Sequence, residues 1–157
     1  PLGTGGALRH ALPLIASKRV VVLNGDSYCP FDLGHLEQFH QQTAGKITLW
    51  LVQVQDKLRY GSVELRPDGQ VLAFTEKSSR SPAGLVSAGV YLFERQAVAE
   101  ITDGVVLSLE TDVFPRYVGQ GLYAVVGSGP FLDIGTPESY AEADQYLEKS
   151  LGIGQQT

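Results

Sequence analysis

Short apolar runs separated by polar turns predict alternating strands and helices. The most continuous run, Val-Val-Val-Leu at 20–23, ends at Asn24-Gly25-Asp26. Unbroken β-branched runs of this kind are typical of strands buried on both faces of a parallel sheet. The same pattern predicts further strands over 47–54, 86–93, 122–126 and 131–135.

Periodic apolar positions predict helices between these strands. Leu8 and Leu12 lie four residues apart in a short helix that follows the Gly-Thr-Gly-Gly sequence at 3–6. The last helix begins at Thr136-Pro137, because Thr is a good N-cap and Pro suits the first helical position, and we expect it to end at Gly152. Other helices are predicted over 33–42 and 96–101 and from Ser108, a candidate cap.

Two alternating runs, 60–65 and 70–75, flank Pro67-Asp68-Gly69 and predict a β-hairpin. The order of elements therefore predicts an α/β fold. We expect a mostly parallel, Rossmann-like sheet flanked by helices, with the hairpin as an excursion from it.

Composition narrows the classes of protein to consider. The 157 residues suit one domain, and 43% hydrophobic and 18% charged residues are ordinary for a globular protein. A net charge of -5 with scattered basic residues argues against nucleic-acid binding. Cys29 is the only cysteine, no signal peptide is evident, and no apolar run could span a bilayer. We therefore expect a cytoplasmic protein with no membrane or nucleic-acid partner.

The chain contains no Met and begins at Pro1, directly before the glycine-rich stretch. We expect a trimmed, incompletely recorded or fragmentary chain. In this interpretation 1–151 is the carboxyl-terminal part of a domain, and 152–157 is a flexible tail.

Carboxylates lie at the polar ends of two of the predicted strands, Asp26 after 20–23 and Asp133 in 131–135. Ligands of open α/β sheets bind just outside the carboxyl ends of the strands, so both carboxylates are well positioned for chemistry. The local sequence does not choose between a turn cap and a functional carboxylate at Asp26. Glu76 and Lys77 are adjacent and follow the second strand of the hairpin. Such a pair is usually solvated and contributes little to stability, but at a strand end above a ligand the lysine could instead neutralise phosphate charge.

Two other features are interpreted more simply from local sequence. Taken alone, the glycines at 3–6 favour a flexible turn over an anion site at a helix N-terminus. His35 and His40 lack neighbours at metal-ligand spacing, so we expect both on a helix surface.

Six motifs, taken together in this order, resemble the sugar-1-phosphate nucleotidylyltransferase family. Within the family, the segment Ser108-Leu109-Glu110-Thr111-Asp112 and the compact carboxyl end look most similar to the manno-heptose 1-phosphate guanylyltransferases. The N-acetylmuramate 1-phosphate uridylyltransferases and glucose-1-phosphate thymidylyltransferases are competitors. The motifs are Leu2-Gly3-Thr4-Gly5-Gly6-Ala7, Asn24-Gly25-Asp26, Tyr60-Gly61, Glu76-Lys77, Ser87-Ala88-Gly89-Val90-Tyr91 and Phe131-Leu132-Asp133-Ile134-Gly135-Thr136-Pro137.

The resemblance implies transfer of a nucleotidyl group from a nucleoside triphosphate to a sugar 1-phosphate. It implies Mg²⁺ held by Asp26 and Asp133, with Lys77 as a third catalytic residue that holds the sugar phosphate. Glu76 would accept hydrogen bonds from sugar hydroxyls. The substrate-binding residues that it implies are Gly3, Thr4, Gly5, Gly6, Asn24, Gly61, Glu76, Ser87 and Gly89.

The chain departs from the family pattern at two places. Ser87 stands where Asn is usual, and the family's opening strand, with its Arg-bearing glycine-rich loop and nearby Lys, is not in the sequence. We therefore expect 20–23 to be an exposed edge that pairs with an amino-terminal segment or with another chain.

Two alternatives stay open. One is a non-catalytic fragment or a regulatory relative that needs a missing segment. The other is a nucleotide-sugar-dependent glycosyltransferase, although Asn24 then stands where the first of two metal-binding aspartates is usual.

Overall fold

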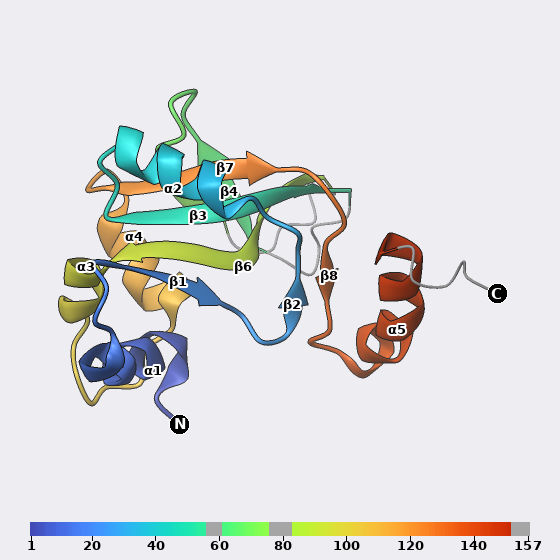
Figure 1. Ribbon diagram of the computed structural model, residues 1–157, viewed down its shortest axis with the longest axis horizontal. Helices are drawn as coiled ribbons and strands as arrows, with labels where there is room; N and C mark the ends of the chain where they lie inside the picture. The colour runs from blue at the N-terminus through green and yellow to red at the C-terminus, as the bar shows by residue number, and fades with distance from the viewer. Residues whose placement is uncertain (56–60, 76–82, 152–157) are drawn as a thin grey trace.

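The computed structural model describes residues 1–55, 61–75 and 83–151. Its centre is a four-stranded sheet in the order β1-β6-β3-β7 (Figure 1), made of β1 (Arg19–Leu23), β6 (Gly84–Glu94), β3 (Ile47–Val54) and β7 (Leu122–Gly127). β1 and β3 both run antiparallel to β6, and β7 runs parallel to β3. Three strands thus share one direction and β6 is reversed between them, which confirms the predicted α/β class.

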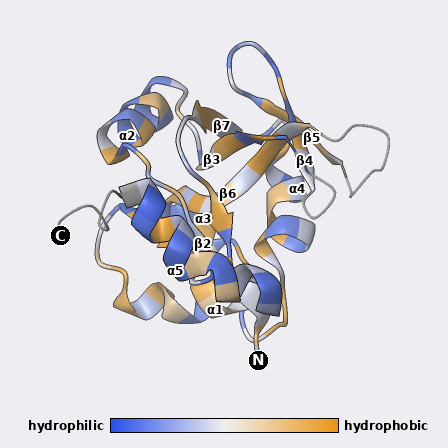
Figure 2. Ribbon diagram, turned by 90° about the vertical axis from the view of Figure 1, so that its right-hand side faces the viewer, coloured by the Kyte–Doolittle hydropathy of each residue, from blue (hydrophilic) through white to orange (hydrophobic). Residues whose placement is uncertain are grey.

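The sheet is covered on both faces, which explains its continuous apolar runs. Alternate side chains of β3 enter different clusters, Leu49 and Leu51 on one face and Trp50 and Val52 on the other. Figure 2 shows the central strands mostly in the hydrophobic colour. One cluster includes side chains of α1 (Gly3–Ala11), η1 (Leu12–Leu14), α3 (Arg95–Ala99), η2 (Leu109–Val113) and α4 (Phe114–Tyr117), and the other includes Leu36 of α2 (Leu33–Gln42).

The predicted hairpin is present as β4 (Ser62–Leu65) and β5 (Val71–Thr75). Its turn needs glycine at position 69, where φ is +82° and a Cβ would lie 2.5 Å from the ring of Phe39. The Gly69 carbonyl accepts a 2.8 Å hydrogen bond from the amide of Ala124. The hairpin turn is thereby fixed to the outer edge of β7.

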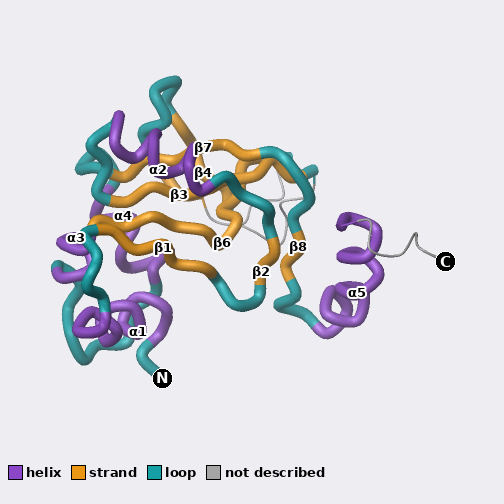
Figure 3. Tube along the Cα trace, in the orientation of Figure 1, coloured by secondary structure: helices purple, strands orange, loops and turns teal. Residues whose placement is uncertain are grey.

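A second small sheet lies beside the central one (Figure 3). It pairs β2 (Ser27–Tyr28) with β8 (Leu132–Asp133), so the predicted strand over 131–135 is shorter than expected. The last helix, α5 (Pro137–Leu151), follows β8 and begins as predicted, with the Thr136 hydroxyl oxygen accepting from the Ser139 amide. The expected tail at 152–157 lies outside the described residues.

Two local predictions were wrong. The glycines at 3–6 form the first turn of α1 instead of a loop before it, because the Leu107 carbonyl accepts from the amides of Gly5 and Gly6. His40 is buried, at 1% exposure, because it fills the space between α2 and β3; the exposed position of His35 is as predicted. No helix among the described residues has the length and apolar character needed to cross a membrane.

Candidate active site

The small sheet brings the segments of the two candidate metal-binding aspartates together. Ser27 of β2 is directly opposite Asp133 of β8, and the carbonyl of Asp26 accepts a 2.9 Å hydrogen bond from the amide of Ile134. Asp26 is exposed in the turn after β1, and Asp133 is partly buried. Two carboxylates that are far apart in sequence therefore lie on adjacent, hydrogen-bonded segments.

Each of these carboxylates has a local partner. The Oδ1 atom of Asp133 accepts a 2.9 Å hydrogen bond from the amide of Gly135, which fixes the turn after β8. The Oδ1 atom of Asp26 accepts a long 3.4 Å hydrogen bond from Ser27 Oγ. The described residues contain no group of three or more His, Cys, Asp or Glu side chains arranged to hold a metal ion.

Asn24 lies against an irregular part of β6. The backbone amide of Asn24 donates to the Gly89 carbonyl at 2.8 Å, and Gly89 has a φ of +73°. A Cβ at position 89 would lie 2.8 Å from the Cβ of Asn24, so the close approach requires glycine. The pairing of β3 with β6 also shifts register here, between Trp50 and Leu51. Bulges of this kind re-aim side chains and are frequent beside active sites.

A chain of hydrogen bonds starts at this bulge. The amide of Gly89 donates to Ser87 Oγ at 3.4 Å, Ser87 Oγ donates to the Tyr91 hydroxyl at 3.3 Å, and that hydroxyl donates to Glu110 Oε1 at 3.4 Å. Burial raises the pKa of Tyr91, and the nearby Glu110 carboxylate adds to the shift. The Asn24 side chain also reaches this hydroxyl and opposes the shift. The phenol therefore keeps its proton at neutral pH.

The glycine-rich start of α1 is tied to the segment that carries Glu110. Thr4 Oγ1 accepts from the Leu109 amide at 2.9 Å, and Ser108 caps η2 by accepting from the amides of Glu110 and Thr111. The amides of Gly5 and Gly6 both donate to the carbonyl of Leu107. These two glycines thus allow close packing of α1, and their amides already have a partner within the protein.

The predicted site residues are only partly assembled by the described structure. Asn24 bonds to Gly89 and Gly89 bonds to Ser87, and the series of hydrogen bonds continues through Tyr91 to Glu110 of η2, a segment that Thr4 also contacts. Asp26 follows Asn24 by two residues and lies beside the Asp133 segment. Gly61 is exposed just before β4, a strand that packs on β6. Glu76 and Lys77 lie outside the described residues, so their placement stays a prediction.

Sequence reasoning did not identify Glu110 as a site residue. The segment 108–112 was recognised only as a capped helix start and as a point of similarity to one branch of the family. Its position opposite Tyr91 depends on the odd-numbered residues of β6 facing the cluster that contains η2. No local signal in the sequence reports that contact.

The other end of the central strands, where β1 and β3 begin and β6 ends, carries different polar groups. Buried His40 contacts Thr48 Oγ1 at 2.7 Å and Glu94 Oε1 at 3.3 Å, and the same Glu94 atom accepts from Arg19 at 2.8 Å. Burial lowers the pKa of His40, and the neighbouring Glu94 opposes the shift. This network connects α2 with the starts of β1 and β3 and with the end of β6, whereas Asp26 follows the other end of β1.

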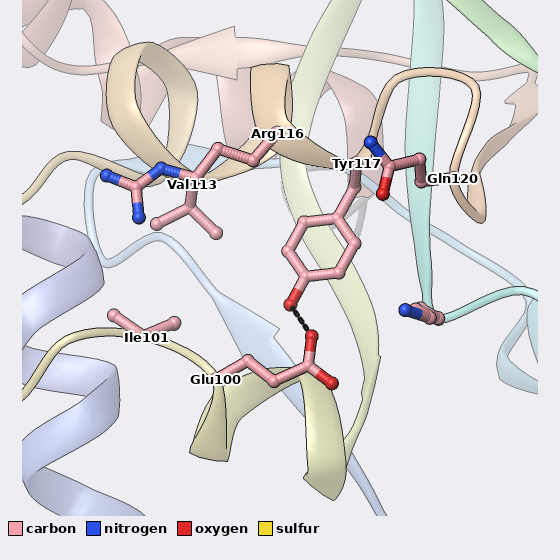
Figure 4. Close-up of a pocket in the computed structure, with 7 residues that line it drawn as sticks. Glu100, Ile101, Val113, Arg116, Tyr117 and Gln120 are labelled. Atoms are coloured by element: carbon pink, nitrogen blue, oxygen red, sulfur yellow. Dashed lines mark hydrogen bonds between the residues drawn. The ribbon is translucent and has the colours of Figure 1, made fainter.

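A pocket of about 220 Å³ lies at this same end of the strands (Figure 4). Within it the Tyr117 hydroxyl donates to Glu100 Oε2 at 2.8 Å. The pocket is lined by Lys46, Glu100, Ile101, Val113, Arg116, Tyr117 and Gln120. None of these is a residue that the sequence suggested for substrate binding.

Known proteins are similar to this chain over nearly its whole length. A mannose-1-phosphate guanylyltransferase of Mycobacterium tuberculosis is 33% identical over 154 residues, which are 96% of this chain and 43% of that protein. A D-glycero-alpha-D-manno-heptose 1-phosphate guanylyltransferase of Aneurinibacillus thermoaerophilus is 32% identical over 154 residues, with 94% and 64% covered.

The similarity extends to a solved structure. The crystal structure of HddC from Yersinia pseudotuberculosis, complexed with GMP-PN, matches with a TM-score of 0.79 and 32% identity, over 92% of this chain and 62% of that one. The chain thus spans less than two thirds of the length of these relatives. The sequence pattern of the nucleotidyl transferase family matches residues 1–150, and the chain belongs to that family.

Proposed function

We propose that the protein transfers a guanylyl group from GTP to a sugar 1-phosphate of manno configuration, releasing pyrophosphate and forming a GDP-sugar. The relatives named as mannose and manno-heptose 1-phosphate guanylyltransferases support the choice of nucleotide and sugar. One structural observation carries the proposal: β2 and β8 bring Asp26 and Asp133 to the edge where Asn24, Ser87 and Gly89 meet.

In the proposed reaction, an oxygen of the sugar phosphate attacks the α-phosphorus of GTP. A new phosphorus–oxygen bond forms, the bond from the α-phosphorus to the bridging oxygen breaks, and pyrophosphate leaves with that oxygen. The attacking phosphate is already anionic, so no residue has to remove a proton. Such transfers depend mainly on positioning and on neutralising phosphate charge.

The two aspartates fit a magnesium ion. Mg²⁺ prefers oxygen ligands, keeps several waters and is held by one or two carboxylates together with substrate phosphates. Asp26 and Asp133 lie on paired segments and would supply two carboxylates to such an ion. When bound, the ion would neutralise charge on the triphosphate.

The remaining roles concern the sugar phosphate. Ser87 would contact a sugar hydroxyl from the bulge of β6, and Gly61 and Gly89 would let the backbone approach the sugar closely. Lys77 would hold the phosphate and Glu76 would accept from hydroxyls, as the family resemblance implies. Cytoplasmic location, and pairing with an amino-terminal segment or a second copy, also remain predictions.

The test is pyrophosphate release by the full-length protein, supplied with GTP, Mg²⁺ and either mannose 1-phosphate or D-glycero-manno-heptose 1-phosphate. Glucose 1-phosphate and the other nucleoside triphosphates serve as competitors. We expect turnover with GTP and at least one manno-configured substrate. Transfer of a sugar from GDP-mannose to an acceptor, without pyrophosphate release, would instead indicate a glycosyltransferase. No turnover with any pair would indicate a non-catalytic protein.

Substitution of the aspartates tests their assignment. Asp26→Asn and Asp133→Asn each keep the side-chain shape and remove the charge. We expect turnover to fall by on the order of a hundredfold, the usual cost of removing a group that stabilises transition-state charge. Asp144→Asn, on the exposed face of α5, is the matched control and should not change turnover. Near-normal turnover of either test variant would contradict its role.

A further inference from the structure

We infer that Glu110 is a positioning residue that acts through Tyr91 to make Ser87 a hydrogen-bond acceptor for a hydroxyl of the sugar 1-phosphate. The inference rests on the proposed function and adds to it a determinant of sugar specificity. It concerns a side chain to which the family resemblance assigned no role.

The direction of these hydrogen bonds follows from the two groups that end the series, the amide of Gly89 and the carboxylate of Glu110. The amide of Gly89 can only donate, so Ser87 Oγ accepts from it. A carboxylate oxygen can only accept a hydrogen bond, so the Tyr91 hydroxyl donates to Glu110. Tyr91 has one proton, and therefore its oxygen must accept the proton of Ser87.

This direction determines what Ser87 offers to a ligand. A serine hydroxyl has one proton and two lone pairs. The bond to Tyr91 uses the proton, and the bond from Gly89 uses one lone pair. One lone pair is left, so partly buried Ser87 is set to accept a hydrogen bond from a sugar hydroxyl.

The surrounding structure holds Tyr91 and Glu110 in place. Tyr91 is 1% exposed, and its ring contacts the rings of Phe93 and Phe114, at centroid distances of 6.5 and 5.1 Å. Glu110 lies in the first turn of a π-helix whose start is capped by Ser108 and held to α1 by Thr4. Single-turn π-helices are frequent at functional sites.

The three hydrogen bonds from Gly89 to Glu110 are long, at 3.3 to 3.4 Å, so each is weak. The direction of donation along the series can therefore reverse at small cost. Removing the acceptor at one end then frees Ser87 to donate. Tyr91→Phe removes the hydroxyl that takes the Ser87 proton. Glu110→Gln supplies an amide that can donate to Tyr91 and thereby reverse the direction.

The experiment measures KM for mannose 1-phosphate and for GTP in the full-length protein. We expect Tyr91→Phe and Glu110→Gln to raise KM for the sugar phosphate about three- to tenfold, the effect of one hydrogen bond, with KM for GTP changed less than about twofold. Tyr117→Phe and Glu100→Gln are matched controls, because they alter a Tyr–Glu pair toward the other end of β6. Both controls should leave both KM values unchanged.

Monodeoxy analogues of mannose 1-phosphate separate this role from a structural one. The wild-type protein should discriminate against the analogue that lacks the hydroxyl read by Ser87, and both test variants should lose that discrimination. In a Ser87→Ala background, Glu110→Gln should have no further effect on KM for the sugar phosphate, because the two act as one unit.

Two outcomes would overturn the inference. One is an effect of Glu110→Gln that persists in the Ser87→Ala background, and the other is an equal rise in KM for both substrates. The proposed function fails separately, by absence of pyrophosphate release from the wild-type protein with every sugar 1-phosphate.

Discussion

Two Tyr–Glu pairs lie toward opposite ends of β6 and differ in what surrounds them. Tyr91 donates to Glu110 at 3.4 Å, and its oxygen also accepts from Ser87 beside the β6 bulge. Tyr117 contacts Glu100 at 2.8 Å and the carbonyl of Ala97 at 3.2 Å, which ties α4 to α3. The hydrogen bonds of the first pair continue to Ser87, a candidate substrate-binding residue, whereas those of the second pair continue to the backbone of α3.

The comparison shows that the same two side-chain types can serve positioning at one end and helix packing at the other. Burial raises the pKa of both tyrosines, so perturbed protonation alone does not distinguish them. What distinguishes them is the next contact along each chain of hydrogen bonds. The following substitutions test that difference.

Gly89→Ala should have the largest effect on stability, and it should act at the site edge. An alanine with a φ of +73° costs about 1–2 kcal/mol, and the new Cβ would also press on Asn24, so we expect a loss of about 2–3 kcal/mol. Urea unfolding measures the loss, and KM for the sugar phosphate should rise in the same variant. Gly104→Ala, at a φ of +70° with open space around it, is the matched control for backbone strain alone. Equal losses in the two variants would contradict the contact with Asn24.

The end of the sheet opposite the site should respond to pH through His40. Its pKa is lowered in the folded protein by burial, while Glu94, Arg19 and Glu37 add smaller effects. The unfolded chain therefore binds a proton first, and stability should fall as pH drops below about 6.5, by at most about 1.4 kcal/mol per pH unit from this one group. Urea unfolding from pH 8 to 5 measures the slope.

Substitution of the histidine isolates its share of that slope. His40→Gln keeps a hydrogen-bonding side chain without titration and should flatten the slope between pH 7 and 5. His35→Gln, exposed on the same helix, should leave it unchanged. A slope that is the same in all three proteins would assign the pH dependence to other groups.

Tyr117→Phe should have the smallest effect. It removes one hydroxyl that contacts Glu100 and Ala97, so we expect a loss of about 1 kcal/mol in the free energy of unfolding. Turnover and both KM values should not change. A rise in KM for the sugar phosphate would show that the Tyr117 pair also acts on the site, and the contrast between the two pairs would then be lost.

Much of the fold could be predicted from local sequence. The bounds of α2 and β3 follow the predicted 33–42 and 47–54, and α5 begins where Thr136-Pro137 indicated. These elements have strong apolar periodicity or a clear cap, and both signals are local. The helical glycines of α1 and the buried position of His40 were missed, because each depends on a partner elsewhere in the chain: Leu107 in one case, Thr48 and Glu94 in the other.

The sequence by itself determined the α/β class, the family and the positions of Asp26 and Asp133 at strand ends. It could do so because short motifs and apolar periods are local properties of the chain. Only the tertiary structure decided that β2 and β8 pair beside those aspartates, and that Glu110 reaches Tyr91. Both contacts depend on strand register and on which face of β6 meets η2, and these are fixed by packing of the whole core.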